Sequence, residues 1–171
     1  VRDVRRLPEG AAGAVAAVGN FDGVHLGHRV VIDGARRIAA ERGRPSAVLT
    51  FEPHPRRLFR PDDPPFRLTP FRGKAQILSE LGIDLMLAAR FNRRFAGITA
   101  DDFVAQVMAR RFGLSHVVCG ADFVFGKGRT GDVALLQRLA PRHGMGVTVI
   151  DPVGDEETVY SSTNIRSLLQ A

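Results

Sequence analysis

Apolar runs of strand length alternate along the chain with longer stretches in which apolar residues recur at helical spacing. The short runs predict five strands, at Ala14–Val18, Ser46–Phe51, Ile83–Ala88, His116–Cys119 and Gly146–Ile150. This alternation is typical of βαβ units, in which a crossover helix joins two parallel strands. We therefore expect an α/β fold built on an open parallel five-stranded sheet with helices on both faces.

Residues that favour helix ends mark the first two helices. The first is predicted from Gly27 to Arg42, before the glycine and proline of RGRP. The second begins after Thr69, a capping residue, and Pro70, which fits a first turn, and it ends at Gly82. Near one side of the first helix we expect Val30, Val31, Gly34 and Ile38.

Three further helices follow later in the chain. Thr99 and Asp102 have the spacing of a capping box, and Gly113 marks the end of the helix that they begin. A fourth helix is predicted after Asp132, and a last one begins near residue 161.

Two segments fit neither a helix nor a strand. Seven of the ten prolines lie between Pro45 and Pro70, so residues 52–70 are predicted to be one long loop after the second strand. Gly120–Asp132 is a glycine-rich loop that also follows a strand. Ligands of an open α/β sheet bind beyond the carboxyl ends of its strands, where we expect four segments to converge. They begin near residues 19, 52, 120 and 161.

Composition narrows the class of protein. The 171 residues, 44% hydrophobic and 25% charged, suit one domain and leave no room for two ordinary ones. The net charge of +6 comes from dispersed arginines, which favours phosphate-bearing ligands only weakly. The single cysteine, Cys119, lies in the apolar run HVVCG, so we expect it in the core of a cytoplasmic protein. No segment is long enough to span a membrane.

The sequence GNFDGVHLGH, at the junction of a strand and a helix, is the strongest candidate for chemistry. Gly23 and Gly27 let the main chain approach a ligand, and the helix N-terminus offers N–H groups to phosphate. His25 and His28, three residues apart, would donate hydrogen bonds to phosphate oxygens. The competing interpretations are turn glycines with surface histidines, or a zinc site completed by Asp22, for which no further ligand is evident.

The sequence YSSTNIRSLL supplies hydroxyl groups at the predicted start of the last helix. Ser161, Ser162 and Thr163 are ordinary capping residues when considered alone. Together with the histidine motif and Arg166, they suggest a second clamp on the same triphosphate. This interpretation requires His28 and Thr163 to lie on the same side of the molecule.

Three further motifs allow a functional and a structural interpretation. LTFEPHP places Phe51 and His54 beside the crevice or in a rigid loop, and FGKGRTGD offers Lys127 and Arg129 to phosphate or to solvent. In FNRRFAGITADDF, the two phenylalanines of FNRRF fit the core and Asn92 a ligand, but periodicity does not decide between these roles.

Taken in order, GNFDGVHLGH, LTFEPHP, FNRRFAGITADDF, GADFVFGKGRTGD and SSTNIR resemble the N-terminal adenylyltransferase module of the bacterial bifunctional riboflavin kinase/FAD synthetase family. The resemblance covers nearly the whole chain. It implies a Rossmann-like nucleotidyltransferase core and the reaction of ATP with FMN to give FAD and pyrophosphate, with Mg²⁺. Family members continue into a riboflavin kinase β-barrel. We therefore expect residues 1–171 to be the FMN adenylyltransferase domain, followed by a kinase domain in the full-length protein but unable to phosphorylate riboflavin itself.

The resemblance also assigns roles to individual residues, with Mg²⁺ carried by the phosphates rather than by a protein cage. The expected catalytic residues are His25, His28, Ser162, Thr163 and Arg166. The expected ATP-binding residues are Gly19, Asn20, Phe21, Asp22, Gly27, His28, Ser161, Ser162 and Arg166. The expected FMN-binding residues are Phe51, His54, Asn92, Asp122, Phe123, Phe125, Lys127 and Arg129. The chain departs from the family pattern at Tyr160 and Val124, where basic residues are common.

Two other functions remain open at this point. The phosphate motifs also fit a nucleotidyltransferase with another acceptor, such as pantetheine phosphate or nicotinamide mononucleotide. A nucleic-acid-binding module is disfavoured because the arginines are dispersed, tryptophan is absent and Tyr160 is the only tyrosine. The expected partners are therefore small molecules, ATP and FMN, and neither nucleic acid nor a membrane.

Overall fold

The computed structural model describes residues 7–62, 67–152, 154–155 and 158–159. Five parallel strands form one sheet in the order β3-β2-β1-β4-β5, which confirms the predicted α/β class. The strands are β1 (Val15–Val18), β2 (Ser46–Glu52), β3 (Leu85–Arg90), β4 (His116–Gly120) and β5 (Gly146–Ile150). The third strand begins later than predicted, and just before it the Asp84 N–H donates to the Ser46 hydroxyl at 3.1 Å while the Asp84 carboxylate accepts from the Ser46 N–H at 2.8 Å.

Alternation within the strands divides the core between the two faces of the sheet. In β1, Ala16 and Val18 belong to one buried cluster, whereas Val15 and Ala17 belong to the other. Successive side chains of a strand point to opposite faces, so a strand that is apolar throughout is buried on both sides. The sheet therefore needs a helical layer on each face.

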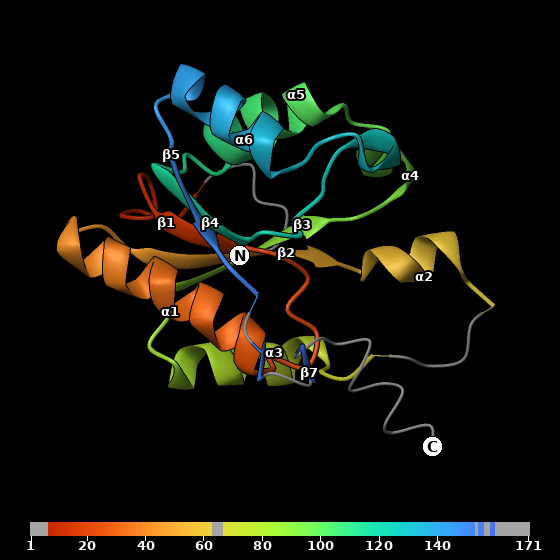
Figure 1. Ribbon diagram of the computed structural model, residues 1–171, viewed down its shortest axis with the longest axis horizontal. Coiled ribbons are helices and arrows are strands. Elements are labelled where there is room, and N and C mark those ends of the chain that lie inside the picture. Colours follow the sequence, from red (N-terminus) through yellow and green to blue (C-terminus); the bar gives the residue numbers. More distant parts are fainter. Residues whose placement is uncertain (1–6, 63–66, 153, 156–157, 160–171) are drawn as a thin grey trace.

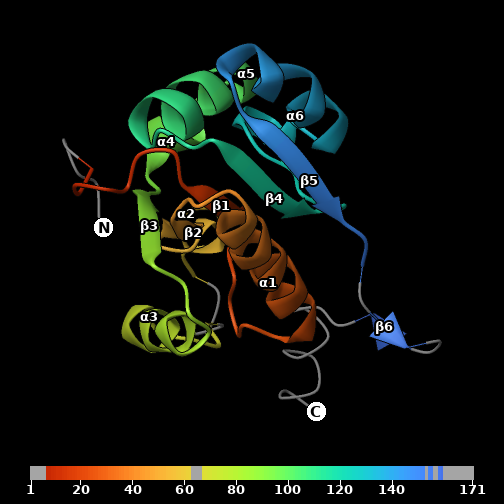
Figure 2. The same ribbon diagram turned by 90° about the vertical axis from the view of Figure 1, so that its left-hand side faces the viewer.

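Figures 1 and 2 show these two layers. On one face lie α1 (Leu26–Glu41) and α3 (Phe71–Glu80), and on the other lie α5 (Ala100–Asp102), α6 (Val133–Leu139), the π-helix η1 (Phe103–Arg111) and the 3₁₀ turn η3 (Ala140–His143). The remaining elements are the short helices α2 (Pro55–Phe59) and α4 (Arg93–Ala96), the 3₁₀ turn η2 (Lys127–Arg129) and the antiparallel pair β6 (Gly154–Asp155) and β7 (Thr158–Val159). The last helix predicted from the sequence lies outside the described residues.

Helix α1 buries the stripe predicted for it, with one exception. Val31, Gly34 and Ile38 are buried, but Val30 is 40% exposed. At 100° per residue, position 30 falls outside the arc that contains positions 31, 34, 35 and 38. Val30 therefore lies at the edge of this side of the helix, next to the buried stripe rather than within it.

Residues 52–70 do not form one continuous loop, which corrects the prediction from their prolines. Helix α2 occupies part of this segment and extends beyond the carboxyl end of β2 in Figure 1. Pro55 is its first residue, where the missing N–H costs nothing, and the Nδ1 of His54 caps it by accepting from the Arg56 N–H at 3.1 Å. The proline content thus limits the length of the helix rather than forbidding it.

The helix predicted after Thr99 occupies the expected residues, with an α-helical first turn followed by a π-helix. Its start is confirmed, because the Asp102 N–H donates to the Thr99 hydroxyl at 3.1 Å, and its end is confirmed by Gly113 at φ +56°. After the first turn it widens into η1, and the Phe112 N–H donates to the carbonyl of Val107, five residues earlier, at 3.0 Å. The wider turn keeps Phe103, Val107 and Phe112 together in the core.

The other helix ends agree with the sequence except at Thr69. The side chain of Asp132 caps α6 by accepting from the Leu135 N–H at 2.8 Å, and Gly82 ends α3 at φ +75°. Thr69, however, does not cap α3, which has Pro70 at that position without a side-chain bond. The part of the chain described here contains no helix that combines the length and hydropathy needed to cross a bilayer.

Candidate active site

The loop between β1 and α1, residues 19–25, has an unusual backbone. Phe21 and Val24 have positive φ angles of 48° and 41°, and both are buried, with exposed fractions of 2% and 3%. Such angles are strained for a side chain with a branched Cβ such as valine. Strain of this kind persists only where surrounding contacts impose it, and it clusters at functional sites.

The segment before α3 supplies several of those contacts. The Asp22 carboxylate, 2% exposed, accepts hydrogen bonds from the N–H groups of Leu68 and Thr69, both at 3.0 Å. The Gly23 N–H donates to the Thr69 hydroxyl at 3.0 Å. This bond explains why Thr69 does not cap its own helix: its hydroxyl holds the loop instead. A Cβ on Gly23 would lie 2.9 Å from the Leu68 side chain, so glycine also permits the close approach.

Lys74 fixes the beginning of the same loop. It reaches from α3 to donate from its Nζ to the Asn20 carbonyl at 2.6 Å, and the Thr50 hydroxyl donates to that carbonyl at 3.0 Å. The lysine is 2% exposed, and burial, together with the positive charge of Arg67, lowers its pKa from 10.5 to about 8. The carboxylates of Asp22 and Glu52 oppose this shift.

His25 and His28 lie together at the N-terminus of α1. His25 caps the helix, and its Nδ1 accepts from the His28 N–H at 3.4 Å. The two imidazoles stack with centroids 3.5 Å apart, and the ring of Phe21 meets His28 edge-on at 5.3 Å. Because Nδ1 of His25 accepts, the neutral ring carries its proton on Nε2 and presents an N–H donor there.

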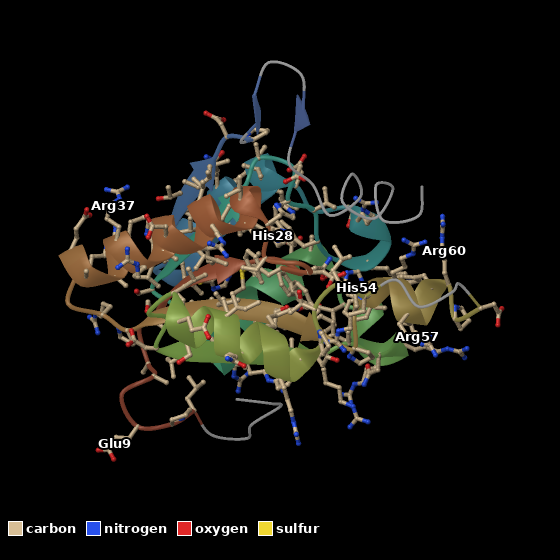
Figure 3. All side chains as sticks on the ribbon, turned by 90° about the horizontal axis from the view of Figure 1, so that it is seen from below. Glu9, His28, Arg37, His54, Arg57 and Arg60 are labelled. Carbon is tan, nitrogen blue, oxygen red and sulfur yellow. The ribbon has the colours of Figure 1, made fainter. Side chains whose placement is uncertain are left out.

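A cleft of about 1140 Å³ opens beyond the carboxyl ends of the strands. Among the described residues it is lined by five separate segments, from the loop after β1 to the end of β5. Figure 3 shows His28 near the middle of the molecule and His54 nearer to α2, with Arg57 of that helix and Arg60 just after it pointing outward. Both histidines line this cleft. The sheet thus gathers motifs that are distant in the sequence, as expected for the switch point of an open α/β sheet.

Phenylalanine side chains form one wall of the cleft, which we call the aromatic wall. Neighbouring ring centroids along it are 5.4 to 6.1 Å apart. Its members are Phe51, Phe59, Phe91, Phe95, Phe103, Phe123 and Phe125. Such a surface suits a flat, largely apolar ligand.

The loop after β4 is joined to the start of α5. Phe125 and Gly131 pair across its base, and the Lys127 N–H donates to the Ile98 carbonyl at 2.7 Å. Gly126 has φ +76°, and a Cβ there would lie 2.7 Å from backbone atoms of Ala100. The backbone hydrogen bonds of the loop therefore fix the position of Lys127 at the cleft.

A family model for FAD synthetase matches residues 7–164 of the chain. The chain belongs to the FAD synthetase family. The match covers more than half of the sequence and confirms the family predicted from the five motifs.

Curated relatives agree with the FAD synthetase match. A bifunctional riboflavin kinase/FMN adenylyltransferase of Escherichia coli (strain K12) is 38% identical over 170 residues, which are 99% of this chain and 54% of that protein. The enzyme of the same name from Pseudomonas fluorescens is 38% identical over 171 residues, covering 100% of this chain and 55% of the relative. The chain thus spans about half the length of these relatives.

A solved structure shares the fold of this FAD synthetase family member. The crystal structure described as a macrolide-efflux protein from Streptococcus pneumoniae superposes with a TM-score of 0.80 and 26% sequence identity. The superposition covers 91% of this chain and 52% of that chain. It supports the α/β architecture found here.

The structure brings most of the expected FAD synthetase site residues to one cleft. These are Gly19, Asn20, Phe21, Asp22, His25, Gly27, His28, Phe51, His54, Asp122, Phe123, Phe125, Lys127 and Arg129. Asn92 does not line the cleft; its Oδ1 accepts from the Phe95 N–H at 2.9 Å and caps α4. Ser161, Ser162, Thr163, Arg166 and the neighbouring Tyr160 lie outside the described residues.

Sequence reasoning missed part of the aromatic wall. Phe91 and Phe95, whose role periodicity left open, line the cleft, as do Phe59 and Phe103, to which the sequence analysis assigned no role. A signal existed in the composition, because the chain has eleven phenylalanines, one tyrosine and no tryptophan. Periodicity cannot separate a core ring from a cleft ring, since both are shielded from water.

The described residues add no further ligand to the zinc site considered for the histidine motif. Within the described ranges, no three histidine, cysteine, aspartate or glutamate side chains gather closely enough to hold a metal ion. Asp22, the third ligand considered, accepts hydrogen bonds from two backbone N–H groups instead.

Proposed function

We propose that this chain is an FMN adenylyltransferase, which transfers AMP from ATP to FMN to form FAD and diphosphate. The observation that supports it is the single cleft in which the histidine loop faces an aromatic wall and a basic loop. Membership in the FAD synthetase family and the names of the curated relatives support the same activity. The riboflavin kinase activity in those names is not proposed for residues 1–171, which match about half of each relative.

The nucleotide phosphates would bind at the histidine loop. The N-terminus of α1, a helix of sixteen residues with no acidic side chain in its first turn, favours anions. The Nε2–H of His25 and the ring of His28 add side-chain donors beside these N–H groups. A strained backbone fixed by Asp22 and Lys74 holds the donors in place before the substrate arrives.

The flavin would bind against the aromatic wall. An isoalloxazine ring is flat and apolar over most of its surface, and it can stack on phenylalanine rings. Lys127 and Arg129 line the same cleft and are exposed, so they can attract the FMN phosphate. His54 also lines the cleft, and its Nδ1 is used in capping α2, which leaves Nε2 as the proton-bearing nitrogen of the neutral ring.

The chemical step needs no covalent enzyme intermediate. An oxygen of the FMN phosphate forms a bond to the α-phosphorus of ATP, while the bond from that phosphorus to the bridging oxygen of the β-phosphate breaks. The departing diphosphate takes the electron pair of that bond, and the chain's task is alignment and stabilisation of charge. Ser162, Thr163 and Arg166 are proposed to hold the departing diphosphate.

Magnesium is proposed as the counter-ion that ATP brings with it. A Mg²⁺ ion held by phosphate oxygens and water needs few protein ligands. The described residues fit this arrangement, because the acidic side chains that line the cleft, Asp22, Asp122 and Asp151, do not gather into a cage.

The test is an acceptor competition. The protein is incubated with ATP, Mg²⁺ and one acceptor at a time: FMN, riboflavin, pantetheine phosphate or nicotinamide mononucleotide. Chromatography should show FAD and diphosphate only in the incubation that contains FMN. Riboflavin should give no product, because it lacks the attacking phosphate. If another acceptor gives a dinucleotide and FMN gives no FAD, the proposal is wrong and the protein is a nucleotidyltransferase for that other acceptor. Salt-sensitive RNA binding without any adenylyl transfer would favour a nucleic-acid-binding module.

A cytoplasmic location is proposed on narrower grounds. Cys119 is fully buried, which confirms its predicted place in the core, and burial together with the nearby Asp122 charge raises the pKa of its thiol to about 11. A lone thiol of this kind suits a reducing compartment.

A further inference from the structure

A buried lysine lies behind the histidine loop, outside the cleft itself. Lys74 is 2% exposed, and its Nζ contacts two oxygens, the Asn20 carbonyl at 2.6 Å and the Thr50 hydroxyl at 3.3 Å. It does not line the cleft. Burying an ammonium group costs free energy unless partners compensate, so an apolar side chain would suit helix packing better here.

We propose that Lys74 is a positioning residue for adenylyl transfer, which acts by holding the Asn20 carbonyl. The carbonyl belongs to the peptide that enters Phe21, the residue with φ +48° whose ring meets His28 edge-on at 5.3 Å. Turning that peptide would relax Phe21 and release the ring that supports His28. Lys74 thus acts on His28 through two residues and never touches the substrate. The inference rests on the proposed FMN adenylyltransferase activity.

The surroundings of Lys74 support a fixed, charged donor at this point. Asp22 on the loop and Glu52 at the end of β2 favour its charge, whereas Arg67, before α3, opposes it. Arg67 is in turn paired with Glu52 at 2.5 Å. Among the described residues, the charged groups that act on the lysine, Asp22, Glu52 and Arg67, thus belong to segments next to the histidine loop or the cleft.

The first test separates positioning from stability. Lys74→Met keeps the stem and removes the donor, and we expect kcat for FAD formation to fall about ten- to a hundred-fold with an unchanged KM for FMN. Arg72→Met, an exposed change on the same helix, should leave kcat unchanged. Leu78→Ala, a buried change one turn further along, should lower the melting temperature but retain kcat below it.

A second variant tests the shared carbonyl. Thr50→Val removes the other donor to Asn20 without changing the volume, and kcat should fall in the same direction. The double variant with Lys74→Met should lose less than the product of the two single losses, because both act on one oxygen. If Lys74→Met does not fold, Thr50→Val alone tests whether the hold on the Asn20 carbonyl matters. A kcat of Thr50→Val equal to that of the wild-type protein then overturns the inference.

A pH profile adds a readout that a structural role would not change. A neutral amine still donates a hydrogen bond but loses the assistance of its charge, so the ratio of wild-type to Lys74→Met kcat should narrow as the pH rises through about 8. A constant ratio, or equal kcat in the two proteins, overturns the inference. If the wild-type protein makes no FAD at all, the proposed function itself has failed.

Discussion

Individual residues of the histidine loop show how strain and chemistry are combined. Phe21 and Val24 hold angles that glycine would adopt more easily, and the surrounding side chains have to maintain them. Asp22 serves this purpose with both carboxylate oxygens, which accept from the Leu68 N–H. The motif therefore contains residues that hold the loop beside residues that we propose bind phosphate, and residue type alone does not separate the two.

His28→Ala should abolish turnover and leave the fold intact. The change removes a side chain that lines the cleft and is proposed to donate to phosphate, so we expect kcat to fall on the order of a hundred- to a thousand-fold. The measurement is FAD formation at saturating ATP and FMN, with circular dichroism as the check on folding. His143→Ala, at an exposed position outside the cleft, is the matched control. Full turnover in His28→Ala would show that the phosphates bind elsewhere.

The stability of the protein should depend on pH through Lys74. The unfolded chain keeps the lysine proton up to pH 10.5, whereas the folded protein releases it near pH 8. The unfolded state binds more protons in between, so the unfolding free energy should rise with pH, by at most about 3 kcal/mol relative to Lys74→Met. Urea titrations of both proteins at about pH 7, 8, 9 and 10, which cover most of the range between the two pKa values, measure this difference.

Cys119 acts in the opposite direction but does not obscure the result. Its pKa rises from 9.0 to about 11 in the folded protein, so its contribution is lost as the pH rises above 9. Both proteins of the comparison contain the thiol, and its effect cancels in their difference. A difference that stays constant from pH 7 to 10 would contradict the shifted lysine.

At the level of elements, helix ends were predictable where the capping group lies close in sequence. Asp132 caps the helix that begins at the next residue by accepting from an N–H three residues away, and Gly82 and Gly113 end helices at their own positions. Thr69 failed as a cap because its hydroxyl meets Gly23, a residue 46 positions away. A competing partner at that distance exists only once α3 has packed beside the loop after β1.

The loop after β4 should tolerate two glycine substitutions unequally. Gly126 and Gly128 both have positive φ, at 76° and 63°, so alanine costs roughly 1 kcal/mol of backbone strain at either position. A Cβ added to Gly126 would lie 2.7 Å from the backbone of Ala100, whereas a Cβ added to Gly128 would lie 4.0 Å from the Thr130 side chain, its nearest neighbour. Gly126→Ala should therefore lower the melting temperature further and raise the KM for FMN.

Gly128→Ala serves as the control for that experiment. It shares the φ penalty and lacks the contact, so the difference between the variants isolates the junction with α5. Equal melting temperatures and equal KM values would mean that the loop can move away from Ala100 without loss.

At the scale of the whole molecule, ligand binding should stabilise the fold. A ligand that binds only the native state, at a hundred times its Kd, adds about 2.7 kcal/mol to the unfolding free energy. We expect ATP with Mg²⁺ and, separately, FMN to raise the melting temperature, and chelation of Mg²⁺ to reduce the ATP effect. Calorimetry of each ligand alone tests the two halves of the cleft independently. No shift with either ligand would count against a nucleotide cleft here.

The sequence by itself determined the features that depend on local spacing. Apolar runs of strand length that alternate with stretches of helical period, and the glycines at helix ends, indicated a parallel sheet between two helical layers. The five motifs indicated the FAD synthetase family, which the family match confirms. These properties are local because side-chain direction repeats every two residues in a strand and every 3.6 in a helix.

Only the tertiary structure decided which side chains share a surface. It assigned Phe91 and Phe95 to the aromatic wall, gave Asn92 to the end of α4 and brought Lys74 to a carbonyl 54 residues away. Periodicity distinguishes a shielded side chain from an exposed one, but a cleft and a core both shield it. The physical reason is that a cleft forms between segments, and its lining follows from how the sheet and its helices pack rather than from any one of them.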